Sequence, residues 1–107
     1  LFRSSAASDV YKRQAYVFYL IESLLDSSKN LHLSEQEKKN LLASMISGAA
    51  NLVLNSDDSP NVLRKKVTSP GGVTQTAIEE FETEGLKEIL SKSMIAAEKK
   101  SIELGED

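Results

Sequence analysis

The segment of this sequence best suited to chemistry is Thr68–Thr74, which reads Thr-Ser-Pro-Gly-Gly-Val-Thr. It joins a rigid turn to the expected start of a helix, where the first amides, around Gly72, Val73 and Thr74, have no partner within the helix. These amides lie beside the positive end of the helix dipole, and glycine lets a ligand approach the backbone closely. The hydroxyls of Ser69 and Thr74 can donate to the same ligand. The segment is therefore suited to bind a carboxylate or a phosphate.

A purely structural interpretation of the same segment stays open. An N-capped loop would also use the two glycines, for the geometry of its turn and not for a ligand. The segment is not a P-loop, because the lysine and the spacing of that motif are absent.

Composition excludes several other kinds of chemistry. The 107 residues contain no cysteine and one histidine, His32, which leaves no thiolate nucleophile, disulfide framework or His-rich metal centre. We expect no bound metal, and an exposed loop position for His32. The net charge of −3 argues against a nucleic-acid partner, which needs a clustered basic surface. No apolar run approaches the roughly 18 residues of a membrane span, so we expect one cytoplasmic domain that does not contact a membrane.

The elements that must position Thr68–Thr74 are all predicted to be helices, about five of them in an all-α bundle. The first, Ala15–Leu25, has nine apolar residues in eleven. A buried strand is the rival interpretation, but the continuation to Asp26 favours a helix by its length. A helix this apolar must be covered on most sides. We therefore expect two copies of the chain to bury it together in an isologous dimer.

A capping box predicts where the second helix begins. Ser34 is followed three residues later by Glu37, so each side chain can bond the backbone amide of the other residue. The helix is expected to end at Asn55–Asp58. Gly48-Ala49-Ala50 forms a patch of small residues on it that would let another helix approach closely.

Three further helices complete the expected bundle. Ser59 is the predicted N-cap of a short helix. Another helix is expected over Gly72–Thr83, with Gly85 as its C-terminal stop. The last is expected over Leu86–Leu104 and ends at Gly105.

The first fourteen residues, Leu1–Gln14, differ in character from the rest of the chain. They show neither a helical nor a strand period. Ala6–Gln14 can be back-translated to a DNA sequence that resembles a transposase sequencing adapter, and Leu1–Ser4 to one that resembles the end of a second common adapter. We interpret the segment as a non-native, disordered tail, with a disordered natural tail as the alternative. On this interpretation the native N-terminal part of the protein is missing.

A longer stretch, Leu63–Glu82, closely resembles the signature segment of pyrroline-5-carboxylate reductases. The resemblance centres on the Ser-Pro-Gly-Gly-x-Thr core at Ser69–Thr74. Upstream, Ala15–Tyr19 is similar to the PAYVF segment that opens the family's C-terminal domain, and downstream Ile102–Gly105 fits its closing helix. The similarity covers Ala15–Asp107.

The resemblance implies an all-helical C-terminal domain, similar to that of 6-phosphogluconate dehydrogenase, which intertwines with its twofold mate in a homodimer. It also implies a preceding Rossmann domain that holds NADPH or NADH. The implied reaction is hydride transfer to Δ1-pyrroline-5-carboxylate, which gives L-proline, the last step of proline biosynthesis. The choice of cofactor and any assembly beyond the dimer stay open.

The resemblance also implies roles for individual residues. Ser69, Gly71, Gly72 and Val73 would bind the substrate carboxylate. Thr74 would lie at the imine nitrogen as a hydrogen-bonding or proton-relaying residue. Because a neutral threonine is a poor acid, positioning or relaying a water proton is the more cautious role.

The sequence departs from the family at three places. The Gly-rich dinucleotide fingerprint is absent, so no cofactor-binding residue is expected in this chain and the chain alone should be inactive. Gln75 stands where the family often has an aliphatic residue, and the lead into Ala15 is the adapter-like segment.

The rival interpretation is a stand-alone helical dimerisation module without enzymatic activity. The basic run Arg64–Lys66 is expected to be a solvated helix face, with a cofactor phosphate contact as the alternative.

Overall fold

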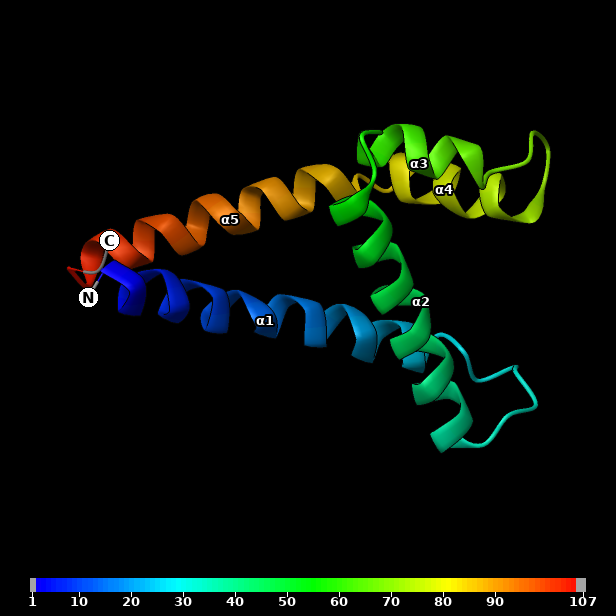
Figure 1. The fold of residues 1–107 in the computed structure, drawn as a ribbon, viewed down its shortest axis with the longest axis horizontal. Coiled ribbons are helices and arrows are strands. Elements are labelled where there is room, and N and C mark those ends of the chain that lie inside the picture. The colour runs from blue at the N-terminus through cyan, green and yellow to red at the C-terminus, as the bar shows by residue number, and fades with distance from the viewer. Residues whose placement is uncertain (1, 106–107) are drawn as a thin grey trace. The chain divides into compact units, whose positions relative to one another are not determined.

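The chain folds into helices joined by short loops (Figure 1). The computed structural model describes the backbone of residues 2–105 and the side chains of residues 13–105. Within residues 2–105 there are five α-helices and no strand, which confirms the predicted all-α class. The chain divides into two compact units, residues 1–57 and residues 58–107.

Helix α1, Phe2–Asp26, opens the first unit and is longer than expected. The sequence predicted a start at Ala15 and disorder before it, whereas the described backbone is helical from Phe2. Phe2–Gln14 contains no proline or glycine, so no residue there prevents the helix from extending N-terminally beyond Ala15. Leu1 and the side chains of residues 1–12 lie outside the described part of the chain. The adapter origin of the segment stays a prediction.

Helix α2, Glu35–Asn55, begins at the predicted capping box. The Ser34 hydroxyl accepts from the Glu37 amide at 3.1 Å, and Glu37 Oε1 accepts from the Ser34 amide at 2.9 Å. The bond that the carboxylate accepts from the Ser34 amide favours its ionised form and, with a smaller contribution from the Ser34 hydroxyl, lowers the pKa of Glu37 below its ordinary value. The helix crosses α1 near the C-terminal end of α1 (Figure 1).

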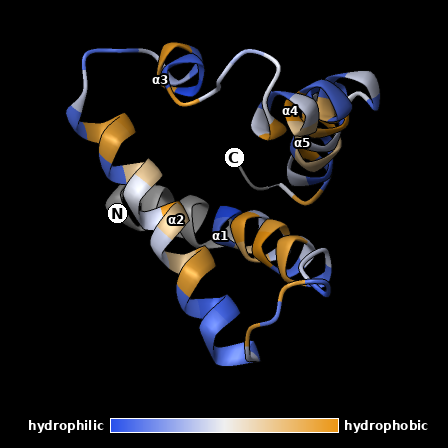
Figure 2. Ribbon diagram, turned by 90° about the vertical axis from the view of Figure 1, so that its right-hand side faces the viewer, coloured by the Kyte–Doolittle hydropathy of each residue, from blue (hydrophilic) through white to orange (hydrophobic). Residues whose placement is uncertain are grey.

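Very little of the first unit is buried. Leu42 and Lys38 are its two buried residues among those whose side chains are described, at 8% and 7% exposure. Lys38 buries its aliphatic stem and brings its Nζ to 3.4 Å from Glu35 Oε1. By contrast, Phe18 and Tyr19 on α1 are 65% and 68% exposed. The apolar stretch of α1, which is orange in Figure 2, therefore carries large side chains that are exposed in the single chain.

The second unit contains α3 (Pro60–Lys66), α4 (Val73–Thr83) and α5 (Leu86–Glu103). Gly85 separates α4 from α5 with φ +74°, and so acts as the stop predicted for the fourth helix. Gly105 has φ +76° and follows the end of α5, also as predicted. Helices α4 and α5 contact one another.

Ser59 is the N-cap residue of α3, as predicted, and has the extended backbone of that position. Its hydroxyl, however, accepts no hydrogen bond from a backbone amide of the first turn. It donates to the side chain of Asn61, at 2.8 Å from Oδ1. Proline at the first position of α3 removes one unsatisfied donor from that turn, which reduces the need for the cap.

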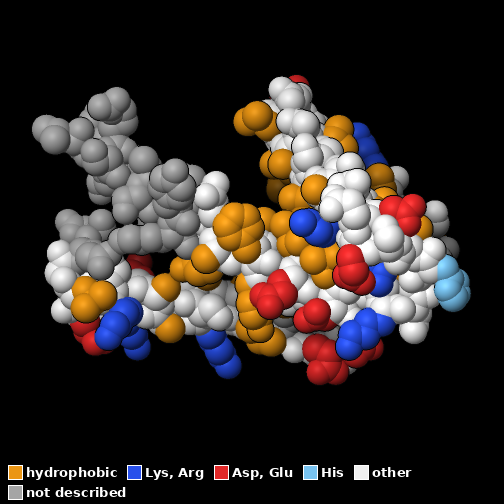
Figure 3. All heavy atoms as spheres, turned by 90° about the horizontal axis from the view of Figure 1, so that it is seen from below, with side chains coloured by type: hydrophobic (Ala, Val, Ile, Leu, Met, Phe, Trp, Pro, Cys, Tyr) orange, Lys and Arg blue, Asp and Glu red, His pale blue; other side chains and the backbone are white. Residues whose placement is uncertain are grey.

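The surface of the described residues mixes apolar and charged side chains (Figure 3). His32 is exposed in the loop between α1 and α2, as predicted. No helix within the described residues is long and apolar enough to cross a membrane.

Candidate functional site

Residues 68–72 form the turn between α3 and α4, and Val73 and Thr74 are the first residues of α4, as the sequence predicted. The N-terminal side of the turn is tied to the end of α3, because the Thr68 hydroxyl donates to the Arg64 carbonyl at 2.6 Å. The Thr68 amide donates to the Lys65 carbonyl at 3.2 Å. The turn is therefore anchored to the helix before it as well as to the helix that it starts.

Both glycines of the turn have their amides engaged inside it. Gly71 has φ +74°, a left-handed conformation that favours glycine, and its amide donates to Gln75 Oε1. Gly72 is the N-cap of α4, and its amide donates to the Ser69 carbonyl at 3.0 Å. The Gly72 amide thus has no partner within α4, as expected, but it is not available to a ligand, because the turn closes on itself through this bond.

The donors left at the start of α4 are the amides of Val73 and Thr74. Among the described residues none accepts a hydrogen bond from either amide. The hydroxyls of Ser69 and Thr74 also have no partner there, whereas the Thr76 hydroxyl donates back to the Gly72 carbonyl at 3.2 Å. Val73 is 88% exposed. These two amides and two hydroxyls are what the turn offers to an anion at the helix N-terminus.

Gln75 was expected only as a tolerated departure from the family, with no role in this turn. Its side chain accepts from the Gly71 amide and donates to Glu79 Oε2 at 3.3 Å. A signal was present in the sequence, because a glutamine in the third position of a helix often reaches back to the residues before the helix. Here it reaches Gly71, one residue before the N-cap.

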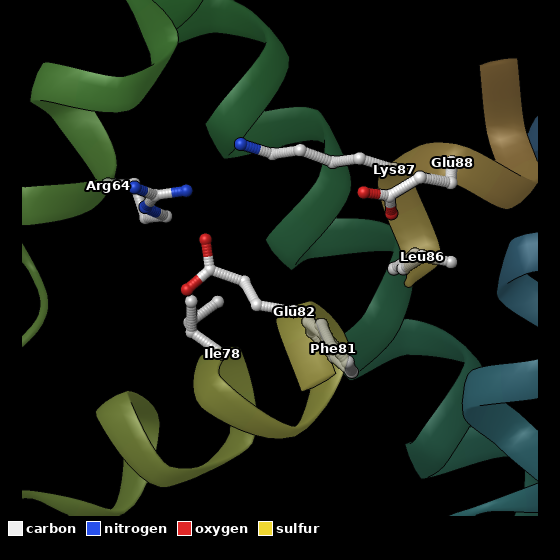
Figure 4. Close-up of a pocket in the computed structure, with 7 residues that line it drawn as sticks. All are labelled: Arg64, Ile78, Phe81, Glu82, Leu86, Lys87 and Glu88. Atoms are coloured by element: carbon white, nitrogen blue, oxygen red, sulfur yellow. The ribbon is translucent and has the colours of Figure 1, made fainter. Parts of the chain in front are cut away.

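A separate cavity of about 170 Å³ lies in the second unit. Arg64 of α3 and Glu82 of α4 approach it from different helices over an apolar floor (Figure 4). Its lining consists of Arg64, Ile78, Phe81, Glu82, Leu86, Lys87 and Glu88. It includes none of the five predicted site residues.

The basic run before the turn is not one uniform solvated face. Lys65 is exposed, as expected. Lys66 forms an ion pair with Asp58, and Arg64 is half-buried at the cavity. The expectation therefore holds for Lys65 and Lys66, which are exposed, and only in part for Arg64, which is half-buried and lines the cavity.

The helices of residues 2–105 leave large apolar side chains exposed, and a glycine turn leads into the start of α4. These features define an all-helical domain with an apolar surface that further protein can cover. The comparisons with known proteins give the family. The model for the family described as pyrroline-5-carboxylate reductase dimerisation matches residues 12–104. The chain belongs to this family.

Relatives and solved structures agree with this assignment. The pyrroline-5-carboxylate reductase of Pseudomonas aeruginosa is 36% identical over 92 residues, which cover 86% of this chain and 34% of that protein. The reductase of Glycine max is 38% identical over 90 residues, which cover 84% of this chain and 33% of that protein. The chain thus spans about a third of the length of these relatives.

Two solved structures share the fold. A pyrroline-5-carboxylate reductase from Coxiella burnetii superposes with a TM-score of 0.81 at 35% identity, over 85% of this chain and 34% of that one. The Plasmodium falciparum pyrroline carboxylate reductase, solved with NADP bound, superposes with a TM-score of 0.78 at 34% identity, over 82% of this chain and 34% of that one. The predicted helical fold and family are confirmed.

Proposed function

We propose that this chain is the dimerisation and substrate-binding part of an NAD(P)H-dependent reductase that converts Δ1-pyrroline-5-carboxylate to L-proline. Membership of the family supports the reaction. The observation that carries the site is the turn into α4, where the amides of Val73 and Thr74 and the hydroxyls of Ser69 and Thr74 have no partner among the described residues.

The substrate carboxylate is the group that this turn would bind. The amides at the start of α4 donate toward it, and the positive end of the helix dipole favours its charge. The hydroxyl of Ser69, from the N-terminal part of the turn, supplies a third donor. In this proposal Gly71 and Gly72 act through the shape of the turn, because their amides are engaged within it.

Thr74 is the residue we propose to serve the imine nitrogen. Its amide and its hydroxyl belong to one residue, so a carboxylate held by the amide places the adjoining ring close to the hydroxyl. The hydroxyl would hold a proton or a water at the nitrogen as negative charge develops there. A threonine does this by positioning, because its own pKa is far from neutral.

The nicotinamide cofactor would be held mainly outside this chain. Gly71 and Gly72 lie between two helices, and within the described residues no strand precedes them. They therefore do not fit a dinucleotide-binding turn, which follows a strand. When bound, the cofactor supplies the hydride. The residues of this chain bind and orient the substrate.

Assembly with a second copy is the other half of the proposal. Large apolar side chains are exposed along α1 and α2, and an open apolar groove on α2 is lined by Ile46, Ala49, Ala50, Val53 and Leu54. The small residues of that groove allow a helix to approach closely. A twofold partner would bury both surfaces.

A chimera tests the proposed reaction. Residues 15–107 would replace the matching part of the Pseudomonas aeruginosa relative, and oxidation of NADPH or NADH would be followed with Δ1-pyrroline-5-carboxylate. We expect turnover. A folded, dimeric chimera without turnover would contradict the reductase function and favour the rival, a dimerisation module without enzymatic activity.

We also propose a cytoplasmic location for the protein. Cell fractionation would test this proposed location.

A further inference from the structure

The side chain of Gln75, on α4, accepts a hydrogen bond from the glycine turn. Among the described residues it is the one side chain of α4 that accepts a hydrogen bond from this turn. Gln75 Oε1 accepts from the amide of Gly71, and the other end of the carboxamide, Nε2, donates to Glu79 Oε2 at 3.3 Å. The Gln75 side chain is half-buried. The carboxamide is thus held at both ends, with its oxygen directed at the turn.

The bond acts on the most adaptable residue of the turn. Gly71 has φ +74°, and glycine adopts many other backbone conformations at little cost. A Cβ at Gly71 would meet no heavy atom within 4 Å, so side-chain packing does not hold this residue in place. Its conformation is fixed by the hydrogen bond that its own amide donates to the Gln75 side chain. The neighbouring hydrogen bond, from the Gly72 amide to the Ser69 carbonyl, also fixes it.

We infer that Gln75 is a positioning residue for the substrate carboxylate. Gln75 holds Gly71 in its place in the turn. The turn then directs the Ser69 hydroxyl and the amides of Val73 and Thr74 toward one ligand. The inference rests on the proposed function, since it concerns the same site. It assigns Gln75 no contact with the substrate.

The opposite role makes the opposite prediction. If the carboxylate itself had to bind the Gly71 amide, Gln75 would compete with it, and removal of the carboxamide would strengthen binding. If Gln75 positions the turn, its removal weakens binding. The sign of the change in KM therefore separates the two roles.

The first measurement concerns the turn and does not depend on activity. Amide hydrogen exchange at Gly71 would be measured in the full 107-residue chain. We expect exchange to accelerate about 10-fold in Gln75→Leu and in Gln75→Met, which both lack an acceptor. Gln75→Glu keeps the acceptor and should preserve the protection. Equal exchange in the wild type and both apolar variants would overturn the inference.

The second measurement concerns the substrate, in the chimera described above. Gln75→Leu and Gln75→Met should raise KM for Δ1-pyrroline-5-carboxylate about 3- to 10-fold and leave kcat close to the wild-type value. The matched control is Gln36→Leu, which removes a comparable bond to Asn40 in the first turns of α2 and should change neither value.

Each remaining result is decisive. A lowered KM would show competition, and an unchanged KM with accelerated exchange would show a structural role only; both overturn the inference. An inactive wild-type chimera would overturn the proposed function and with it the role toward substrate. The exchange result would still decide whether Gln75 holds Gly71.

Discussion

The amide of Gly72 donates to the carbonyl oxygen of Ser69 at 3.0 Å, and a Cβ atom on Gly72 would lie 3.1 Å from that same oxygen. The bond that closes the turn thus brings the backbone of Ser69 to where a side chain on residue 72 would begin. The φ of Gly72 is −88°, which any residue can adopt. Glycine is favoured here by close approach and not by a left-handed backbone.

Gly72→Val should therefore raise KM for Δ1-pyrroline-5-carboxylate in the chimera. The branched side chain must push the Ser69 carbonyl away, and we expect it to block the substrate carboxylate from the amides at the start of α4. We expect KM to rise at least about 10-fold, as for the loss of a charge-assisted hydrogen bond. Steady-state kinetics would measure it. An unchanged KM in a folded variant would remove Gly72 from the site.

Thr74→Ala should lower kcat more than it weakens substrate binding. Its hydroxyl is proposed to serve the charge that develops at the imine nitrogen, so the interaction is made mainly in the transition state. We expect kcat of the chimera to fall about 10- to 1,000-fold. Lys92→Ala, a change on an exposed part of α5, is the control. Full turnover in Thr74→Ala with a loss in Lys92→Ala would leave the fold assignment and refute the site.

Phe18→Glu should prevent self-association of the 107-residue chain. Phe18 is 65% exposed in the single chain, so the change costs a monomer little, while a charge buried in a dimer interface is costly. Sedimentation at micromolar concentration should show the wild type as a dimer and the variant as a monomer. Glu22→Lys, on the same helix, provides a control for charge. A stable, folded wild-type monomer would contradict the proposed dimer.

Ser34→Ala should destabilise the first unit by about 1 kcal/mol, because it removes the hydroxyl that accepts from the Glu37 amide. Urea unfolding at pH 7 would measure the loss. Ser59→Ala is a matched control, since Ser59 occupies an N-cap position without making the cap bond. We expect the control to change stability by less than about 0.5 kcal/mol. Equal losses in the two variants would refute the role of the capping box.

The same capping box predicts a pH dependence. The pKa of Glu37 is lowered in the folded chain, chiefly by its bond to the Ser34 amide. At a pH above 4.5, the ordinary pKa of a glutamate, the ionised form of Glu37 therefore stabilises the fold. This stabilisation is lost as the pH falls through the lowered pKa of the folded chain. The stability difference between the wild type and Glu37→Gln should be present at pH 7 and shrink as the pH falls below 4.5. A difference that grows toward acid would show that the sign is wrong.

Deletion of Leu1–Gln14 should change the free energy of unfolding by less than about 0.5 kcal/mol. The family match begins at residue 12, and Arg13 and Gln14 are exposed. Thermal unfolding of the full and shortened chains would measure the effect. A clearly larger loss would mean that this part of α1 is native structure. Sequencing the DNA upstream of the Ala15 codon would show independently whether native coding sequence has been replaced.

Local signals in the sequence determined where most helices begin and end. The Ser34 and Glu37 pair predicted the start of α2, and Gly85 and Gly105 predicted helix ends, because capping bonds and left-handed glycines depend on a few neighbouring residues. The start of α1 could not be predicted in this way. Phe2–Gln14 lacks an apolar period, but it also lacks any residue that ends a helix.

The location of the candidate site was also determined by the sequence, because the order Ser-Pro-Gly-Gly-Val-Thr before a helix fixes a turn and an N-terminus together. Only the tertiary structure decided which donors in it are engaged. The Gly72 amide closes on Ser69, and the Gly71 amide is taken by Gln75 four residues later. Those choices depend on φ and ψ angles and on the reach of one side chain, which the residue types do not specify.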